Sequence, residues 1–451
     1  MSEDPRRARR GPSPVTPAVA VPAEGARAVP QKRTITTTTL VFALLCGNAV
    51  VMYIDRTNMA IAAPLIQRSF GLDNVSLGFA FSTFSIAYAA LMVAGGRLGD
   101  RIGARLGLTI CGVIWAAGTF MTGLAGGLLG LAAARLLVGT GEAAVYPISS
   151  SVIGRWIPEH WRGFAQGTLH GCGRLGAAVT PFAVTALILA FSWRIAFLIL
   201  GVASLLVSAV ILAYLRDDPR QHPLITRAEL ARLGHHEEAP DPAFGSRPPP
   251  LAWADFFRRV WPVTAISFCY GWFSWFLLSW VPLYFTHVHG LNLKHVALFS
   301  TLVLIAGVLG EVCGGLATDA RLKRIGDARR ARRDIVIAAF LAAMLCILPL
   351  LFTANLLADT IFLALSYFMV ELADSSIWML GMEVLPSHTA TSTATVNTGF
   401  ALAGAVSPLV VGWLLDVTGG RWSDVFMVSI VVLLLGPVAA CLPAPAQSAA
   451  A

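Results

Sequence analysis

Two residues of opposite charge stand next to each other at the end of an apolar stretch. The stretch is VVMYIDRTNM (50–59), and the residues are Asp55 and Arg56. Inside a bilayer an ionisable side chain costs about 2.5–3.5 kcal/mol, so we expect it to face a partner or a wet cavity. A buried carboxylate whose arginine partner comes and goes can bind and release a proton, and a guanidinium can hold an anion in two bonds. The pair therefore predicts proton and anion chemistry.

A second pair of charges lies further along the chain. Arg135 and Glu142 are seven residues apart, which is about two turns, so they share one face of a helix. Asp55 and Arg56 are about 100° apart around their helix, so one can face Arg135 and Glu142 while the other faces a cavity. The alternative, a static buried ion cluster that fixes helix packing, stays open.

Arg174, in HGCGRLGAAVTP, is a further cation inside an apolar segment. A second cation in a cavity would suit a substrate with two anionic groups or a compact strong anion. In the alternative interpretation Arg174 pairs with Glu371 or Asp374 and never meets substrate.

The composition places these charges in a membrane. Of the 451 residues 56% are hydrophobic and 13% are charged, against about a quarter charged in an ordinary soluble domain. Segments of about 20 apolar residues span a bilayer as helices. We predict an all-α membrane protein with twelve such segments, at roughly 37–60, 76–96, 106–127, 130–151, 163–190, 192–214, 260–286, 295–317, 334–354, 357–384, 390–415 and 424–442.

Most of the 33 Lys and Arg residues fall before the first segment or in alternate loops. Basic residues stay on the cytoplasmic side, so we expect a multi-pass protein of the inner (plasma) membrane with both termini in the cytoplasm. This asymmetry accounts for the net charge of +8 without a nucleic-acid partner. The seven cysteines show no metal-ligand spacing, so we expect no metal site.

The chain reads as two related halves. The long polar interval 216–258 separates six segments from six, which predicts bundles at 37–215 and 259–442, a disordered tail at 1–36 and a short tail at 443–451. GGRLGDRIGARLG in the first half corresponds to GGLATDARLKRIG in the second, and GAAVTP to AGAVSP. Duplicated halves with a site between them are typical of alternating-access transporters, although helix packing alone can also produce matches of small residues.

The loop GGRLGDRIGAR resembles the signature loop of the major facilitator superfamily. The resemblance implies that Gly96, Asp100, Arg101 and Arg105 form a latch that favours the outward-facing state. The second copy departs from the pattern, with Ala320 in place of the arginine.

Within that superfamily YIDRTN, RLLVGTGEAAVYP, WVPLYF and VNTGFALAGAVSP are similar to segments of the anion:cation symporter family, which includes carriers of galactonate, glucarate and hexuronates. The resemblance implies that Asp55 and Glu142 take up the proton, that Arg135 pairs with them in turn, and that Arg56 meets the substrate carboxylate. By the same resemblance the cavity is lined by Tyr53, Tyr88, Ser375, Trp378 and Asn397.

We therefore expect a monomeric secondary active transporter that imports an organic anion, such as a sugar acid, with protons. We expect no catalytic residues and no cofactor, with the proton gradient as the driving force. The alternatives are efflux or exchange of an anion or drug by the same fold, and a membrane sensor or receptor that does not transport. An enzyme is not expected, because the adjacent His235 and His236 lie in a Pro-rich polar linker.

Overall fold

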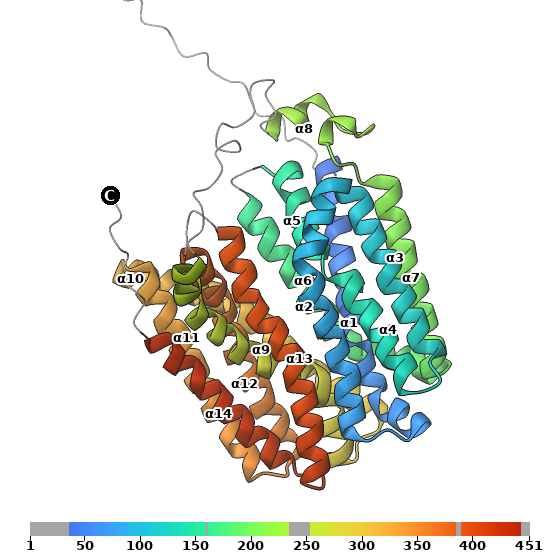
Figure 1. The fold of residues 1–451 in the computed structure, drawn as a ribbon, viewed down its shortest axis with the longest axis vertical. Coiled ribbons are helices and arrows are strands. Elements are labelled where there is room, and N and C mark those ends of the chain that lie inside the picture. Colours follow the sequence, from blue (N-terminus) through green and yellow to red (C-terminus); the bar gives the residue numbers. More distant parts are fainter. Residues whose placement is uncertain (1–35, 159–160, 234–252, 385–388, 443–451) are drawn as a thin grey trace, which may run out of the picture.

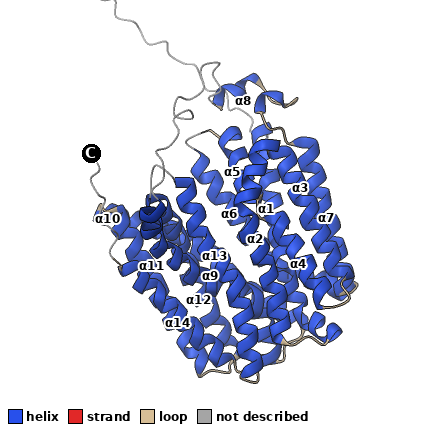
Figure 2. Cartoon of the chain, viewed as in Figure 1, coloured by secondary structure: helices blue, strands red, loops and turns tan. Residues whose placement is uncertain are grey.

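The chain is helical throughout the residues that the computed structural model describes, which are 36–158, 161–233, 253–384 and 389–442 (Figure 2). The α-helices are α1 (Thr37–Phe70), α2 (Asn74–Ile102), α3 (Ala104–Leu124), α4 (Leu128–Glu142), α5 (Val145–Trp156), α6 (Arg162–Ala190), α7 (Trp193–Tyr214), α8 (Arg227–Arg232), α9 (Trp253–His289), α10 (Leu293–Ile325), α11 (Ala328–Ile347), α12 (Leu356–Val384), α13 (Thr389–Val417) and α14 (Trp422–Cys441). Two short 3-10 helices, η2 (Pro219–Gln221) and η4 (Leu348–Leu351), complete the described secondary structure.

Twelve helical spans are long and apolar enough to cross a membrane, so the predicted all-α fold with twelve transmembrane helices is confirmed. The fourth span is built from α4 and α5, which together cover Leu128–Trp156. Several helices run past their apolar segments. Helix α1 continues to Phe70 and stops at Gly71, whose φ of 63° is a left-handed conformation that glycine adopts without a Cβ penalty.

The helices form two bundles that lie side by side (Figure 1). Helices α1 to α7 make the N-terminal bundle, in which α1 packs on α6 and α3 packs on α4 and α7. Helices α9 to α14 make the C-terminal bundle, in which α10 packs on α12 and α9 packs on α13 and α14. Across the interface α2 packs on α13 and α6 on α10. The exact boundaries proposed for the bundles stay a prediction, and the structure starts α9 at Trp253 rather than near 260.

The bundles meet tightly at the end of the molecule that lies away from α8. There Asp416 of α13 accepts hydrogen bonds from the backbone N–H groups of Asn74 and Val75, at 3.2 and 2.8 Å. Gly78 lies so close to α13 that a Cβ on it would be 2.4 Å from the carbonyl oxygen of Pro408. Small residues at such contacts let two helix backbones approach. This end of the interface is therefore closed.

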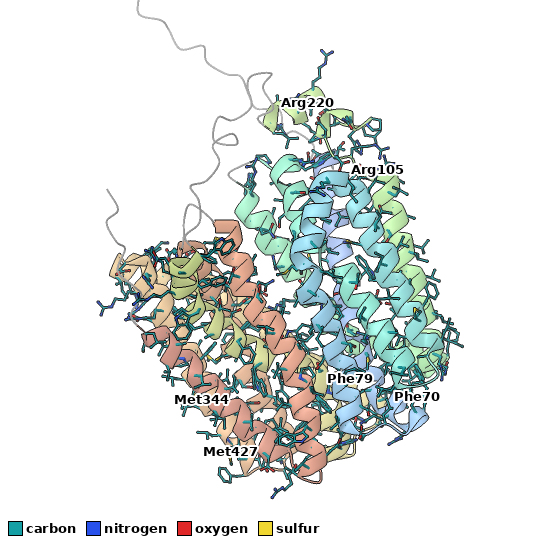
Figure 3. The ribbon with its side chains drawn as sticks, in the orientation of Figure 1. Phe70, Phe79, Arg105, Arg220, Met344 and Met427 are labelled. Atoms are coloured by element: carbon teal, nitrogen blue, oxygen red, sulfur yellow. The ribbon has the colours of Figure 1, made fainter. Side chains whose placement is uncertain are left out.

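Helix α8 lies at the opposite end, where Figure 3 also places the labelled side chains of Arg105 and Arg220. Thr226 and Glu229 form a capping box at its start. A Glu229 oxygen also accepts a 3.4 Å bond from the backbone N–H of Thr38, at the beginning of α1. The linker helix is thus attached to the N-terminal bundle. The tails predicted at 1–36 and 443–451 lie outside the described residues, apart from Thr36, and so do His235 and His236.

Candidate functional site

Asp55 lies in the middle of α1 and has no exposed surface. One carboxylate oxygen, Oδ2, accepts a short hydrogen bond from the hydroxyl of Ser204 in α7. The other, Oδ1, accepts a 3.4 Å bond from the side-chain amide of Asn58, one turn along α1. The carboxylate thus points into the N-terminal bundle, toward α7.

Arg56 points the other way and pairs with Glu142. Its Nε lies 2.8 Å from Oε2 of Glu142, and the two side chains are 4% and 0% exposed. The guanidinium also lies over three aromatic rings, at 4.5 Å from Tyr53, 5.3 Å from Phe84 and 5.1 Å from Tyr88. Such contacts stabilise a cation most where water is excluded. Among the described residues, Nη2 of Arg56 has no hydrogen-bond partner.

Arg135 lies behind this pair and is held by oxygen atoms of α1. Its Nη2 donates a 2.9 Å bond to the side-chain oxygen of Asn58. Longer bonds of 3.4 Å run to the backbone carbonyls of Asp55 and Arg56. In this state Arg135 makes no described ion pair with either predicted carboxylate, and Asn58 bridges it to Asp55.

Arg56 and Arg135 also line a pocket between the bundles. Its walls come from α1, α2, α4 and α9 and are otherwise mostly apolar or aromatic, with Thr57, Ala60, Phe81, Phe84, Trp275, Leu278 and Ser279. In this state the pocket has room for a water-sized group. Its lining residues come from both halves of the chain.

Arg174 reaches from α6 into the C-terminal bundle. Its Nη2 lies 3.0 Å from a carboxylate oxygen of Glu371 and 3.6 Å from one of Asp374, and its Nε lies 3.3 Å from Glu311. Nη2 also donates a 2.5 Å bond to the hydroxyl of Tyr270. In this state Arg174 pairs with Glu371 and Asp374, which is the pairing that the alternative interpretation of the sequence expects.

Tyr53 connects the two arginine sites. One face of its ring receives Arg56. The ring edge packs on Gly173, where a Cβ would come within 2.7 Å of Tyr53 Cε2, and Gly173 directly precedes Arg174. The two cations therefore lie on either side of one buried tyrosine.

The remaining predicted cavity residues also lie near the interface between the bundles. The ring of Trp378 is 6.1 Å from His170, which stacks on Tyr146 at 4.4 Å. Asn397 of α13 donates a bond to the sulfur of Met92 in α2, at 3.2 Å. Ser375 is half-buried on α12 and faces Gly315 of α10.

The predicted latch is described only in part. Gly96 belongs to α2, the side chain of Asp100 lies outside the described part of the chain, and Arg101 is exposed. The Nε of Arg105 donates a 2.7 Å bond to the backbone carbonyl of Leu212, and its backbone N–H donates to Asp217 at 2.9 Å. Arg105 is thus attached within the N-terminal bundle in this state.

Sequence reasoning missed several polar partners of the charges. Ser204 is one of two serines in the very apolar span α7, and Asn58 lies in the YIDRTN motif itself. Ser274 and Tyr270 of α9 both donate to Glu371. Polar residues inside apolar spans were the available signal, but nothing in their spacing says which charge each one meets. In the described residues no group of three or more His, Cys, Asp or Glu side chains could hold a metal ion.

Comparison with known proteins identifies the family. Residues 45–408 match the Major Facilitator Superfamily. The chain is 37% identical over 409 residues to a protein of Cupriavidus necator described as a probable sulfoacetate transporter, SauU, covering 90% of this chain and 94% of that one. It is 26% identical to the hexuronate transporter of Bacillus subtilis, covering 86% and 90%.

A solved structure supports the fold. A bacterial homologue of the human lysosomal transporter Spinster, in an inward-facing and unoccupied conformation, superposes with a TM-score of 0.70 at 16% identity, covering 90% of this chain and 97% of that one. The resemblance drawn from the loop and helix motifs is confirmed. The chain belongs to the major facilitator superfamily and is a transporter, not an enzyme.

Proposed function

We propose that this transporter imports a small organic anion together with protons, and that the anion carries two acidic groups, as sulfoacetate does. The relatives whose descriptions name sulfoacetate and hexuronate support an anionic substrate. The observation that carries the proposal is Arg56, a residue that lines the pocket between the bundles and has a buried guanidinium nitrogen without a described partner. A buried donor without a partner is costly, and an anion would remove that cost.

Two cations suit two acidic groups. Arg56 binds one group through the planar fork that Glu142 leaves partly free. Arg174, beyond Tyr53, receives the second group. Tyr53 and Tyr88 form the wall behind Arg56, and Ser375, Trp378 and Asn397 complete the cavity on the side of the C-terminal bundle.

Proton coupling belongs to Asp55, Glu142 and Arg135. Asp55 accepts hydrogen bonds from Ser204 and Asn58 and makes no described ion pair, so its charged form is incompletely compensated in a dry site. Glu142 is compensated by Arg56 as long as no substrate takes that arginine. When an anion binds Arg56, the charge of Glu142 loses its partner. Glu142 must then bind a proton or pair with Arg135.

The orientation in the membrane decides to which side this state opens. We place α8, both termini and the basic loops in the cytoplasm, because basic residues are retained on that side. The end closed by Asn74 and Asp416 is then the outer end, and this state faces inward. The transporter acts as a monomer in the inner membrane, and Asp100, Arg101 and Arg105 latch it when it faces outward.

The test is uptake into proteoliposomes. Radiolabelled sulfoacetate, galactonate and glucuronate are offered with and without an inward proton gradient. We expect one anion to accumulate only with the gradient, and Asp55→Asn and Arg56→Ala each to reduce that uptake at least tenfold. Arg68→Ala, at an exposed position of the same helix, serves as the matched control and should transport normally.

The outcomes separate the alternatives. Gradient-driven uptake that survives Asp55→Asn would remove Asp55 from coupling and favour exchange. Efflux from preloaded vesicles without uptake would show that the protein exports its substrate. Binding without accumulation of any anion would favour a sensor.

A further inference from the structure

We propose that Glu371 is an internal stand-in for the transported anion: it occupies Arg174 while the site is empty, and the substrate displaces it. This inference rests on the proposed function. It assigns to Glu371 the tasks of setting anion affinity and of taking up a proton when its arginine is lost.

Glu371 is bound as an anionic ligand would be. Its carboxylate has no exposed surface. It receives the hydroxyl of Tyr270 at 3.0 Å, the hydroxyl of Ser274 at 3.2 Å and Nη2 of Arg174 at 3.0 Å. Three donors around one carboxylate stabilise its ionised form. The C-terminal bundle thus supplies two hydroxyls and the N-terminal bundle supplies the cation.

The contact between Glu371 and Arg174 joins the two bundles, the parts that must move relative to each other. In the described part of the chain, the ion pairs that cross between the bundles all involve Arg174. Glu371 and Arg174 both lie near the middle of their helices, α12 and α6. An anion that enters between the bundles at this depth meets an arginine that is already occupied.

The charges around Arg174 are unbalanced, with more acidic than basic groups. The groups facing Arg174 are Glu311 from α10, Glu371 and Asp374 from α12, Tyr270 from α9 and Tyr53 from α1, with His170 on its own helix. Tyr367 of α12 also faces Glu371. One guanidinium serves three carboxylates, and in the described part of the chain none of the three pairs with another cation.

The consequence is a defined proton step. When the substrate takes Arg174, the Glu371 carboxylate is left buried without its cation, and an uncompensated buried charge is strongly unfavourable. It gains one proton from the aqueous side of the cavity and becomes a neutral acid that donates or accepts within the cluster. This proton forms one new O–H bond on Glu371. Each anion that binds is therefore accompanied by one proton at this site.

Anion binding to purified protein in nanodiscs tests this, with sulfoacetate as the probe. A resident competitor lowers apparent affinity by the fraction of time it occupies the site. Glu371→Gln should therefore bind sulfoacetate about tenfold or more tightly than the wild type. Proton uptake on binding, followed with a pH indicator in weak buffer, should fall by about one proton per anion in the same variant.

A second variant keeps the proposal testable if Glu371→Gln does not fold. Ser274→Ala removes one donor from the resident carboxylate and leaves its charge, so it should also bind the probe more tightly, by a smaller factor. Ser267→Ala, a buried serine of the same helix α9, is the matched control and should match the wild type. Unchanged or weaker affinity in both Glu371→Gln and Ser274→Ala, with an unchanged proton count, would overturn the proposal.

A measurement without ligand separates this inference from the proposed function. If the wild type binds no sulfoacetate, the substrate proposed above is wrong, and infrared spectra of the empty protein decide the rest. The difference between wild type and Glu371→Gln should contain the bands of an ionised carboxylate. The band of a protonated carboxyl group in that difference would show that Glu371 is no stand-in for an anion.

Discussion

The Nε of Arg56 lies 2.8 Å from Oε2 of Glu142, and this buried bond ties α1 to α4. The pair leaves Oε1 of Glu142 and Nη2 of Arg56 without described partners. The charges of the two side chains are therefore incompletely compensated, and each side chain can bind a further ligand. The same bond makes the two residues dependent on each other for stability.

Removing one member of this pair should destabilise the protein strongly. Glu142→Ala leaves a buried guanidinium without its counter-ion, which typically costs about 3–5 kcal/mol. The double variant Arg56→Met/Glu142→Leu removes both charges and should recover most of the loss. Apparent unfolding midpoints in detergent measure both. A double variant no more stable than Glu142→Ala would contradict the pairing.

Asp416 should hold the closed end of the interface. Asp416→Ala removes its bonds to the Asn74 and Val75 backbone N–H groups, and bonds to a charged group contribute about 1.5–3 kcal/mol each. Spin labels at the exposed positions Arg68 and Lys294 should report longer distances in this variant. Asp424→Ala, whose carboxylate pairs with Arg421 in its own bundle, should leave the distances unchanged.

The sequence allowed the membrane helices to be predicted well, because twelve apolar segments of spanning length leave little choice of structure. It also predicted that Asp55, Arg56, Arg135 and Glu142 gather, since buried charges need partners. It could not assign the partners. Arg56 and Arg135 are both within reach of Glu142, and side-chain rotation, not spacing, decides that Arg56 takes it. The bonds of Asp55 to Ser204 and of Asp416 to α2 join segments distant in sequence, and no periodicity encodes them.

Close approach of α2 and α13 should be essential for closing the end of the interface that lies away from α8. A Cβ at Gly78 would be 2.4 Å from a backbone carbonyl oxygen, which cannot move aside cheaply. Gly78→Val should destabilise the closed state by about 1–3 kcal/mol and so lower the ratio of closed to open molecules about 5- to 150-fold, as measured with the same spin labels. Gly47→Val is the control, because a Cβ at Gly47 meets nothing within 4 Å. Equal closure in both variants would show that the glycine contact is dispensable.

Attachment of α8 to the N-terminal bundle should depend on pH through Glu229. Burial of this side chain acts to raise its pKa, but bonds from the backbone N–H and hydroxyl of Thr226 and from the backbone of Thr38 outweigh burial and lower the pKa below its ordinary value. A lowered pKa stabilises the attached state above the unfolded value of about 4.3, and this stabilisation is lost as the pH falls through the folded value.

A spin label at the exposed position Arg232 should therefore be immobile at neutral pH and gain mobility below about pH 4. Glu229→Ala should be mobile at both, because alanine cannot accept the hydrogen bonds from Thr226 and Thr38 that a carboxylate or amide oxygen accepts at this capping position. Arg227→Gln, an exposed neighbour on the same helix, should keep the wild-type pH dependence. If Glu229→Ala also stays immobile at neutral pH, contacts other than those of Glu229 hold the linker helix in place.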